Sequence, residues 1–229
     1  MTGNLLIVVP TRGRPGNIAR LLDSVHATSK LKTHIHIGVD DDDPELENYH
    51  RVMDKAAKPG DEMTVGPRKG LTEWTNEIAI PNAENYPFLA SFGDDMVPRT
   101  PGWDKSLIEG IERMSGTGLV YPWDSTREDI PEACVISSDI VRELGWFCHP
   151  DLSHWFVDNV WADLGHGANC IRHLRAIAVD HIWKADATSK DSGDAFTADR
   201  AAYYDWRKTR MVDDIAIITA LRERVPENA

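Results

Sequence analysis

Three apolar runs, each ending abruptly in polar residues, constrain the fold of this chain most strongly. They read LLIVVP at residues 5–10, HIHIGV at 34–39 and YPFLASF at 86–92. Such continuous, β-branched runs are typical of strands buried on both faces, as in a parallel sheet. Apolar side chains recur at helical spacing over residues 17–25 and 72–80, and Asn17 is suited to cap the first of these helices. This alternation predicts an α/β fold with a mostly parallel, doubly wound sheet, helices on both faces and ligands at the carboxyl ends of the strands.

The second half of the sequence is less regular but continues the pattern. Helices are expected at residues 106–114, 138–144 and 155–165, and strands at 132–137 and 171–183. Pro81 is expected to stop the helix over 72–80. A chain of 229 residues suffices for one sizeable domain and is short for two. We therefore expect one domain over residues 1–185 and a C-terminal helical tail over 186–229 that packs on it.

The composition excludes several classes of protein. Hydrophobic residues make up 41% of the chain and charged residues 27%, which rules out wholesale disorder. The formal net charge of −12 makes the surface as a whole acidic, which disfavours nucleic acids and anionic membranes as partners. The first apolar run is too short for a signal peptide, and no run is long enough to span a membrane. Three widely spaced cysteines, Cys134, Cys148 and Cys170, are expected to be buried, reduced thiols, so we expect a cytoplasmic protein, or one in the host cytoplasm if the source is viral.

Polar segments directly follow the first two strands. Pro10, Thr11, Arg12 and Arg14 lie at a strand-to-helix turn, where backbone amides and cations suit a phosphate group. Four aspartates at residues 40–43 follow the second strand, where a carboxylate can accept hydrogen bonds from a nucleobase or ribose. A solvated turn is the alternative for each segment. Calcium binding is a weaker interpretation of the aspartates, because four consecutive residues cannot all point at one ion.

A pair of carboxylates, Asp94 and Asp95, follows the third strand. Gly93 before them permits a sharp bend of the chain. Hard oxygen ligands at such a position suit Mg²⁺ or Mn²⁺ bound to a diphosphate. The sequence therefore predicts a divalent metal site at the end of this strand.

Four blocks of the sequence, in this order and at this spacing, resemble the family 2-type glycosyltransferases of the glycosyltransferase A fold. They read LLIVVPTRGRPGNIARLLDSV, IHIGVDDDD, RKGLTEWTNEIA and FLASFGDDMVPRTPGW. A later block, ISSDIVRELGWF, resembles the family's segment of helix, glycine and aromatic residue, and FVDNVW falls where the family has its acceptor-side Glu-Asp pair. The resemblance covers about residues 5–185 and implies the glycosyltransferase A fold with an Asp-x-Asp-like metal motif.

The resemblance also implies a site for a nucleotide-sugar. Carried over by position, its residues are Pro10, Thr11, Arg12, Arg14, Asp40, Asp42, Arg68, Lys69, Gly70, Asn76 and Asp94. Asp40 or Asp42 would meet the base of the nucleotide, and Asp94 would touch the ribose or a metal-bound water.

The metal ligands and the catalytic base follow in the same way. Asp95 matches the last carboxylate of the Asp-x-Asp motif, whereas Gly93 stands where the first one usually lies. His181 matches a late histidine that completes the metal site in some members, with a structural histidine as the alternative. Asp158 matches the catalytic base, although Val157 replaces the glutamate that usually precedes it.

The implied reaction is the transfer of a sugar from a nucleotide diphosphate-sugar, most simply a UDP-sugar, to a hydroxyl group. The reaction would depend on Mn²⁺ or Mg²⁺, and a single base implies inversion at the anomeric carbon. Three alternatives stay open: a nucleotidyltransferase, a hydrolase of nucleotide-sugars, and a non-catalytic module that binds a sugar-nucleotide or glycan.

A cationic and aromatic segment in the tail bears on the acceptor. Its candidate acceptor-binding residues are Arg200, Tyr203, Tyr204, Trp206 and Arg207. Cations hold phosphates and aromatic rings stack on displaced bases, so a 5-hydroxymethylpyrimidine in DNA, the acceptor of some small viral enzymes, is the leading specific acceptor. The alternatives are a helix that packs its aromatic side chains on the domain, and a glycan, lipid or small-molecule acceptor.

Overall fold

The computed structural model describes residues 4–124, 130–182 and 193–224. The strands are β1 (Leu5–Thr11), β2 (Thr33–Asp40), β3 (Glu62–Gly66), β4 (Phe88–Ser91), β5 (Met96–Pro98), β6 (Leu119–Trp123), β7 (Val135–Ser137) and β8 (Ile171–His181). The helices are α1 (Pro15–Thr28), α2 (Leu46–Ala56), α3 (Leu71–Asn82), α4 (Trp103–Glu112), α5 (Ser138–Leu144), α6 (Val157–Gly167), α7 (Gly193–Thr209) and α8 (Met211–Arg224).

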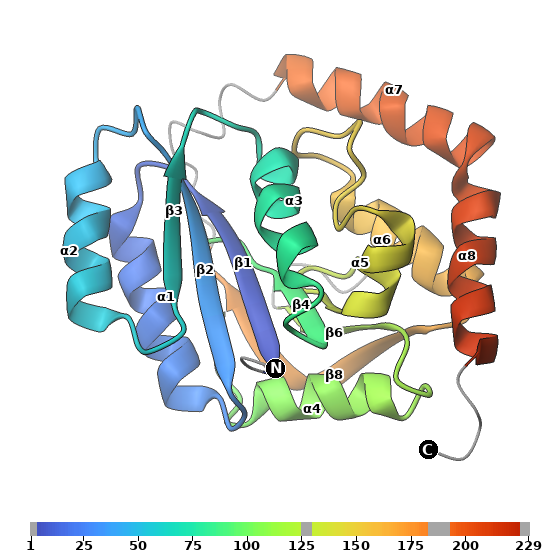
Figure 1. Ribbon diagram of the computed structural model, residues 1–229, viewed down its shortest axis with the longest axis horizontal. Coiled ribbons are helices and arrows are strands. Elements are labelled where there is room, and N and C mark those ends of the chain that lie inside the picture. The colour runs from blue at the N-terminus through green and yellow to red at the C-terminus, as the bar shows by residue number, and fades with distance from the viewer. Residues whose placement is uncertain (1–3, 125–129, 183–192, 225–229) are drawn as a thin grey trace.

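The strands form one sheet in the order β3-β2-β1-β4-β7-β6-β8-β5 (Figure 1). The four strands from β3 to β4 run parallel to one another, and β6 and β8 are also parallel. Antiparallel pairing occurs where β7 joins β4 and β6, and at the short edge strand β5. The mostly parallel α/β sheet predicted from the sequence is therefore confirmed.

Side-chain alternation along β1 builds a core on each face of the sheet. Leu6 and Val8 face a cluster contributed by α3, α5, α6 and α8, whereas Leu5, Ile7 and Val9 face one contributed by α1, α2 and α4. All five side chains are at most 2% exposed. Burial on both faces is the physical reason why the run has no polar position.

Several elements were not predicted from the sequence. α2, β3, β5 and β6 lie in stretches for which no element was expected. β5 has only three residues and β6 contains a proline, so neither carries a strong periodic signal. α2 was missed although Leu46, Tyr49, Val52 and Met53 recur at helical spacing, because the helix is polar on average and only Tyr49 is buried.

Two helix ends also differ from expectation. α1 begins at Pro15, so Asn17 is not its cap, and the Asn17 amide donates to Asp94 instead. Proline is favoured in the first helical turn because the N–H that it lacks would be unpaired there. α3 continues through Pro81 and ends one residue later, at Asn82.

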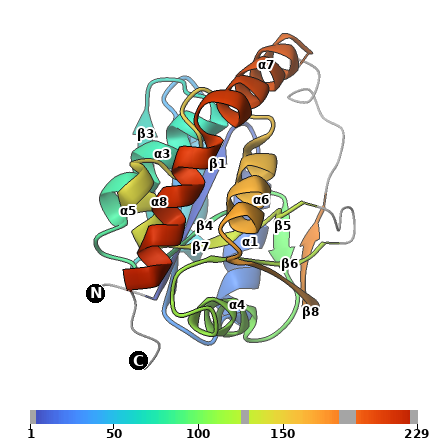
Figure 2. The same ribbon diagram turned by 90° about the vertical axis from the view of Figure 1, so that its right-hand side faces the viewer.

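The C-terminal helices pack on the sheet domain. α8 lies against α5 and α6, and Figure 2 shows α7 crossing above them. Trp206, Ile218 and Leu221 belong to the same core cluster as residues of β1 and α3. The three cysteines are free and buried, as expected. Among the described helices, none has the length and apolarity that a bilayer crossing requires.

We predict that Gly38→Ala weakens the attachment of α3 to β2. A Cβ atom at Gly38 would lie 2.8 Å from the ring of Trp74 and 3.2 Å from Ile78 Cδ1. The overpacking should lower the free energy of unfolding by roughly 1–3 kcal/mol, measured by urea denaturation. Gly16→Ala is the matched control, because a Cβ there would have no atom within 4 Å and stability should be unchanged or slightly raised. Equal stability of the two variants would contradict this packing.

Candidate active site

The carboxylate of Asp40 ties together the loops that follow three neighbouring strands. It lies at the end of β2 and is 3% exposed. Arg12, after β1, donates to it from Nη1 over 2.8 Å. Lys69, after β3, donates its backbone N–H over 3.1 Å, and Trp74 donates from Nε1 over 2.8 Å. The edge predicted to bind the nucleotide is therefore held in shape by a buried acceptor.

The other aspartates of the run divide into accessible and inaccessible groups. Asp42 has a side chain 53% exposed and pairs with Arg12 at 2.5 Å. That hydrogen bond, aided by the charges of Arg12 and Arg68, lowers the pKa of Asp42. Asp43 is buried and accepts the backbone N–H of Gly13. Of Asp40 and Asp42, the two candidates for base recognition, Asp42 is the one that faces solvent.

Asp94 holds the turn after β1. It is 2% exposed, and it accepts a hydrogen bond from Thr11 Oγ1 at 2.6 Å and one from Asn17 Nδ2 at 3.3 Å. Arg14 Nε lies 3.0 Å from the same carboxylate. Burial raises the pKa of Asp94, although these partners favour its charged form. The structure thus brings Thr11, Arg14 and Asp94 together, with the Asp94 carboxylate engaged within the protein.

Tyr49 completes this corner and was not predicted, because it lies on α2. Its hydroxyl accepts the backbone N–H of Arg14 at 2.7 Å and lies 3.0 Å from Thr11 Oγ1. Burial raises its pKa to about 12, so the hydroxyl stays neutral. The turn that carries Arg14 is therefore fixed from both the strand and α2.

The predicted metal ligands Asp95 and His181 lie side by side. β5 and β8 pair with Met96 opposite His181, and the N–H of Ile182 donates to the carbonyl of Asp95. This register brings His181 Nε2 to 3.2 Å from Asp95 Oδ1.

Two further carboxylates surround the same imidazole. His181 Nδ1 lies 2.9 Å from Glu132 and 3.8 Å from Asp124. One ligand atom from each of Asp124, Glu132 and His181 falls within 4.8 Å of the others. Neither acid was predicted from the sequence. Asp124 directly follows β6, a strand that was not predicted, whereas Glu132 begins the segment over 132–137 that was expected only as a strand.

The electrostatics of this cluster favour a cation at its centre. Hydrogen bonds to Asp95 and Glu132 raise the pKa of His181 to about 10. Burial would raise the pKa of Asp95, but the hydrogen bond and charge of His181 outweigh burial and lower it. Carboxylate oxygens and an imidazole nitrogen form a donor set that suits Mn²⁺ or Mg²⁺. The residues present therefore fit a divalent cation.

The residues predicted to flank the nucleotide-sugar just before α3 and on it, Lys69, Gly70 and Asn76, contact other parts of the protein. Lys69 Nζ pairs with Glu77 at 2.7 Å and lies 4.3 Å from the centre of the Trp74 ring. Asn76 Oδ1 accepts the N–H groups of residues 147 and 148, and its Nδ2 donates to the carbonyl of residue 148. Gly70 is the N-cap of α3, and a Cβ there would lie 3.2 Å from the carbonyl oxygen of Ser153.

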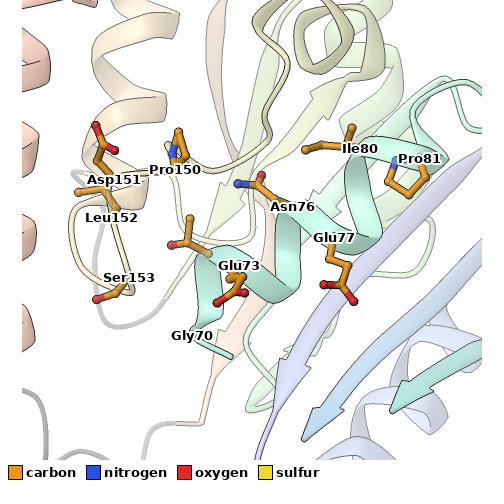
Figure 3. Close-up of a pocket in the computed structure, with 11 residues that line it drawn as sticks. Gly70, Glu73, Asn76, Glu77, Ile80, Pro81, Pro150, Asp151, Leu152 and Ser153 are labelled. Carbon is orange, nitrogen blue, oxygen red and sulfur yellow. The ribbon is translucent and has the colours of Figure 1, made fainter. Parts of the chain in front are cut away.

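A groove lies between α3 and the loop over residues 150–153 (Figure 3). Its volume is about 710 Å³. Its walls combine apolar side chains with carboxylates: Ile80, Pro81, Pro150, Leu152, Glu73, Glu77 and Asp151. Gly70 and Asn76 also line it, so part of the predicted donor site borders this groove.

Asp158, the predicted base, lies half-buried in the first turn of α6. Phe156 was expected to lie inside this helix, but it is the N-cap instead, with φ of 67°. Burial raises the pKa of Cys134 and Cys148 well above the usual value, and the charge of Asp158 adds to this. The Asp158 carboxylate is therefore partly buried, and its charge acts on two buried thiols of the core.

Three other acids compete for this role: Asp151, Asp163 and Asp180. Asp151 is exposed and lines the groove beside α3, whereas the other two are paired within the protein. Asp163 accepts a hydrogen bond from Tyr203 Oη at 2.8 Å and pairs with Arg207. Asp180 pairs with Arg99 at 2.8 Å.

The candidate acceptor residues on α7 separate into two sets. Tyr203 and Trp206 are 7% and 2% exposed, and Trp206 Nε1 donates to Asp214. A nucleobase cannot stack on rings that are buried against the domain. Tyr203 and Trp206 therefore pack on the domain, which was the alternative to acceptor binding. Tyr204 is 52% exposed, with Arg200 5.9 Å from its ring centre, and Arg207 is partly exposed beside Asp163.

Comparison with known proteins places the fold. No protein-family model and no curated protein sequence matches this chain. Among solved structures, S. aureus TarS 1–349 in complex with UDP-GlcNAc matches with a TM-score of 0.64 at 11% identity, over 82% of this chain and 61% of that one. The chain thus spans less than two thirds of the TarS chain.

Two other structures match over more of their own length. The mannosyltransferase PcManGT from Pyrobaculum calidifontis, in complex with GDP-Man and Mn²⁺, has a TM-score of 0.64 at 10% identity, over 96% of this chain and 74% of that one. Glucosyl-3-phosphoglycerate synthase from Mycobacterium tuberculosis, with Mn²⁺, UDP and glucosyl-3-phosphoglycerate, has a TM-score of 0.61 at 9% identity, over 86% and 77%. The chain therefore has the glycosyltransferase A fold that the sequence predicted.

Proposed function

We propose that this protein is a metal-dependent glycosyltransferase that uses a nucleotide diphosphate-sugar. One observation carries the proposal: the acidic cluster around His181 and the cationic turn of Arg12 and Arg14 meet through the adjacent Asp94 and Asp95. A cation site beside a phosphate-binding turn is the arrangement that a nucleotide diphosphate requires. The fold supports the same function, because solved structures with this fold hold UDP-GlcNAc or GDP-Man.

Asp95 and His181 would hold Mn²⁺ or Mg²⁺, with Asp124 and Glu132 as further ligands. When bound, the ion would neutralise charge that develops on the leaving diphosphate. Arg14 and Lys69 supply cations near the phosphates, and Asp42 presents the exposed carboxylate for the nucleotide base. A UDP-sugar is the proposed donor.

Asp158 is the proposed base for the acceptor hydroxyl. Its half-buried carboxylate sits at the start of α6, and two of the three competing acids, Asp163 and Asp180, are held in ion pairs, which leaves Asp151 as the rival. A single base that activates the acceptor implies inversion at the anomeric carbon. General-base catalysis contributes roughly 10²–10⁴-fold to such a reaction.

We propose that the acceptor presents neutral hydroxyl groups, as a glycan does. The groove beside α3 carries Glu73, Glu77 and Asp151, and the chain has a net charge of −12. Carboxylates accept hydrogen bonds from hydroxyl groups but repel phosphates. A 5-hydroxymethylpyrimidine in DNA is the competing acceptor, which the exposed Arg200 and Tyr204 favour.

A panel assay tests donor, metal and acceptor together. The protein is incubated with Mn²⁺ and UDP-glucose, UDP-GlcNAc or GDP-mannose, with neutral oligosaccharides or with 5-hydroxymethylcytosine DNA. We expect nucleotide release and a matching gain in acceptor mass that EDTA abolishes and Mn²⁺ restores. Asp95→Ala should stay folded and lose transfer. Full transfer in EDTA would contradict the metal assignment, and mass gain on DNA alone would contradict the neutral acceptor.

Asp158→Asn tests the base. The change keeps the shape of the side chain but removes its basicity, so donor binding should survive while transfer falls by roughly 10²–10⁴-fold. Asp163→Asn is the matched control on the same helix and should reduce transfer far less. A product of inverted configuration should accompany the wild-type enzyme. A retained configuration, or full transfer by Asp158→Asn, would refute this role.

The titration of His181 tests the cluster without any turnover. In the metal-free protein its ring should stay protonated through pH 8, because its pKa is raised to about 10. Its contribution to stability is present in full below pH 6.5 and is lost as the pH rises through about 10. Histidine NMR shifts measure this, and Asp95→Asn should lower the pKa more than Glu132→Gln. A pKa near 6.5 in the wild type would show that the carboxylates do not enclose the ring.

A further inference from the structure

The buried carboxylate of Asp199, on α7, organises the loop that leads into α6. Asp199 is 2% exposed. Its oxygens accept the backbone N–H groups of Ser153, His154 and Trp155 at 2.9, 2.8 and 2.7 Å. The hydroxyl of Ser153 also lies 3.0 Å from both oxygens. Three successive amides thus converge on one acidic side chain that is distant in the sequence.

The segment held by Asp199 connects the two sides of the proposed site. The carbonyl of Ser153 accepts the N–H of Thr72 at 3.3 Å, in the first turn of α3 on the donor side. On the other side, Trp155 is followed by Phe156, whose φ of 67° is unusual for an aromatic residue. Asp158 comes two residues later, in the first turn of α6. Residues 153–155 therefore connect the first turn of α3 to the first turn of α6.

α7 holds α6 at two more points on the same helical face. The ring of Tyr203 stacks on Phe156 with 5.1 Å between centroids, and its hydroxyl donates to Asp163. Arg207 Nε lies 3.2 Å from Asp163. Residues 199, 203 and 207 are four apart and so lie along one side of the helix.

We propose that α7 sets the position of the catalytic base, and that Asp199 is the positioning residue of that device. The inference rests on the proposed role of Asp158 and adds a function for the C-terminal helices. A base must lie within hydrogen-bond reach of the proton that it removes. A displacement of about 1 Å can cost roughly 100-fold in rate, so a fixed loop before α6 has direct catalytic value.

The test compares Asp199→Asn with Asp205→Asn in the full chain. Both changes remove one negative charge from α7, but Asp205 is exposed and lies outside the proposed site. In Asp199→Asn, an NH₂ group takes the place of one carboxylate oxygen. Because this group is a donor, it cannot accept the backbone N–H groups that the oxygen accepted. We expect turnover to fall roughly 10–100-fold in Asp199→Asn, with an unchanged apparent Kd for the active nucleotide-sugar of the panel, and no change in Asp205→Asn. Equal turnover in the two variants would overturn the proposal.

A double-variant cycle separates positioning from general damage to the fold. If Asp199 acts through Asp158, adding Asp199→Asn to Asp158→Asn should lower the residual turnover by no more than about twofold. If Asp199→Asn lowers turnover as much in the Asp158→Asn background as it does alone, Asp199 acts independently of the base. That result would refute the positioning role. If Asp158→Asn alone keeps full turnover, the proposed base is wrong and the positioning role falls with it. The two failures are therefore distinguishable.

Tyr203→Phe provides a second variant should Asp199→Asn fail to fold. It keeps the stack on Phe156 and removes only the hydrogen bond to Asp163. Its turnover should fall by a smaller factor, and this loss should also vanish in the Asp158→Asn background. Hydrogen exchange should show faster exchange at the start of α6 and unchanged protection in β1 and β2. Unaltered exchange and turnover in Tyr203→Phe would count against the role of α7.

Discussion

Buried aspartates that accept several hydrogen bonds hold the loops of this protein in place. Asp40 joins the ends of three parallel strands, and Asp94 fixes the turn that follows β1. Asp104, which is fully buried, does the same at the other end of β2, where the strand begins. It accepts hydrogen bonds there from residues 30, 31 and 33. Asp199 repeats the arrangement for the loop before α6. A buried charge is costly unless it is fully paired, so each of these carboxylates permits only a loop conformation that satisfies it.

The adjacent Asp94 and Asp95 show how one strand end serves two purposes. Asp94 turns toward Arg14 and Thr11, and its oxygens are used within the protein. Asp95 turns toward His181 on β8, a strand that comes from the other half of the sheet. One short segment thereby links the proposed nucleotide turn to the acidic cluster. The pKa values of the two carboxyl groups move in opposite directions, because burial dominates at Asp94 and His181 dominates at Asp95.

Helix α7 contacts the loop before α6 as well as the core. Its Trp206 side chain belongs to the core cluster, while Asp199 reaches the loop that enters α6. The aromatic and cationic pattern of α7 has a structural use through Tyr203 and Arg207, which both contact Asp163. What remains exposed on this helix, notably Tyr204, is a smaller surface than the sequence pattern indicated.

The sequence by itself determined the strands over residues 5–10 and 34–39, the parallel sheet and the strand-end position of Asp40, Asp94 and Asp95. These features are local: a strand buried on both faces needs an unbroken apolar run, and its polar residues collect where it ends. Only the tertiary structure decided that Asp124 and Glu132 join His181, that Asp199 holds residues 153–155, and that Tyr203 faces inward while Tyr204 does not. Each of these depends on contacts between segments far apart in the chain. β5, with three residues, has too short a pattern to be recognised alone and is specified by its pairing with β8.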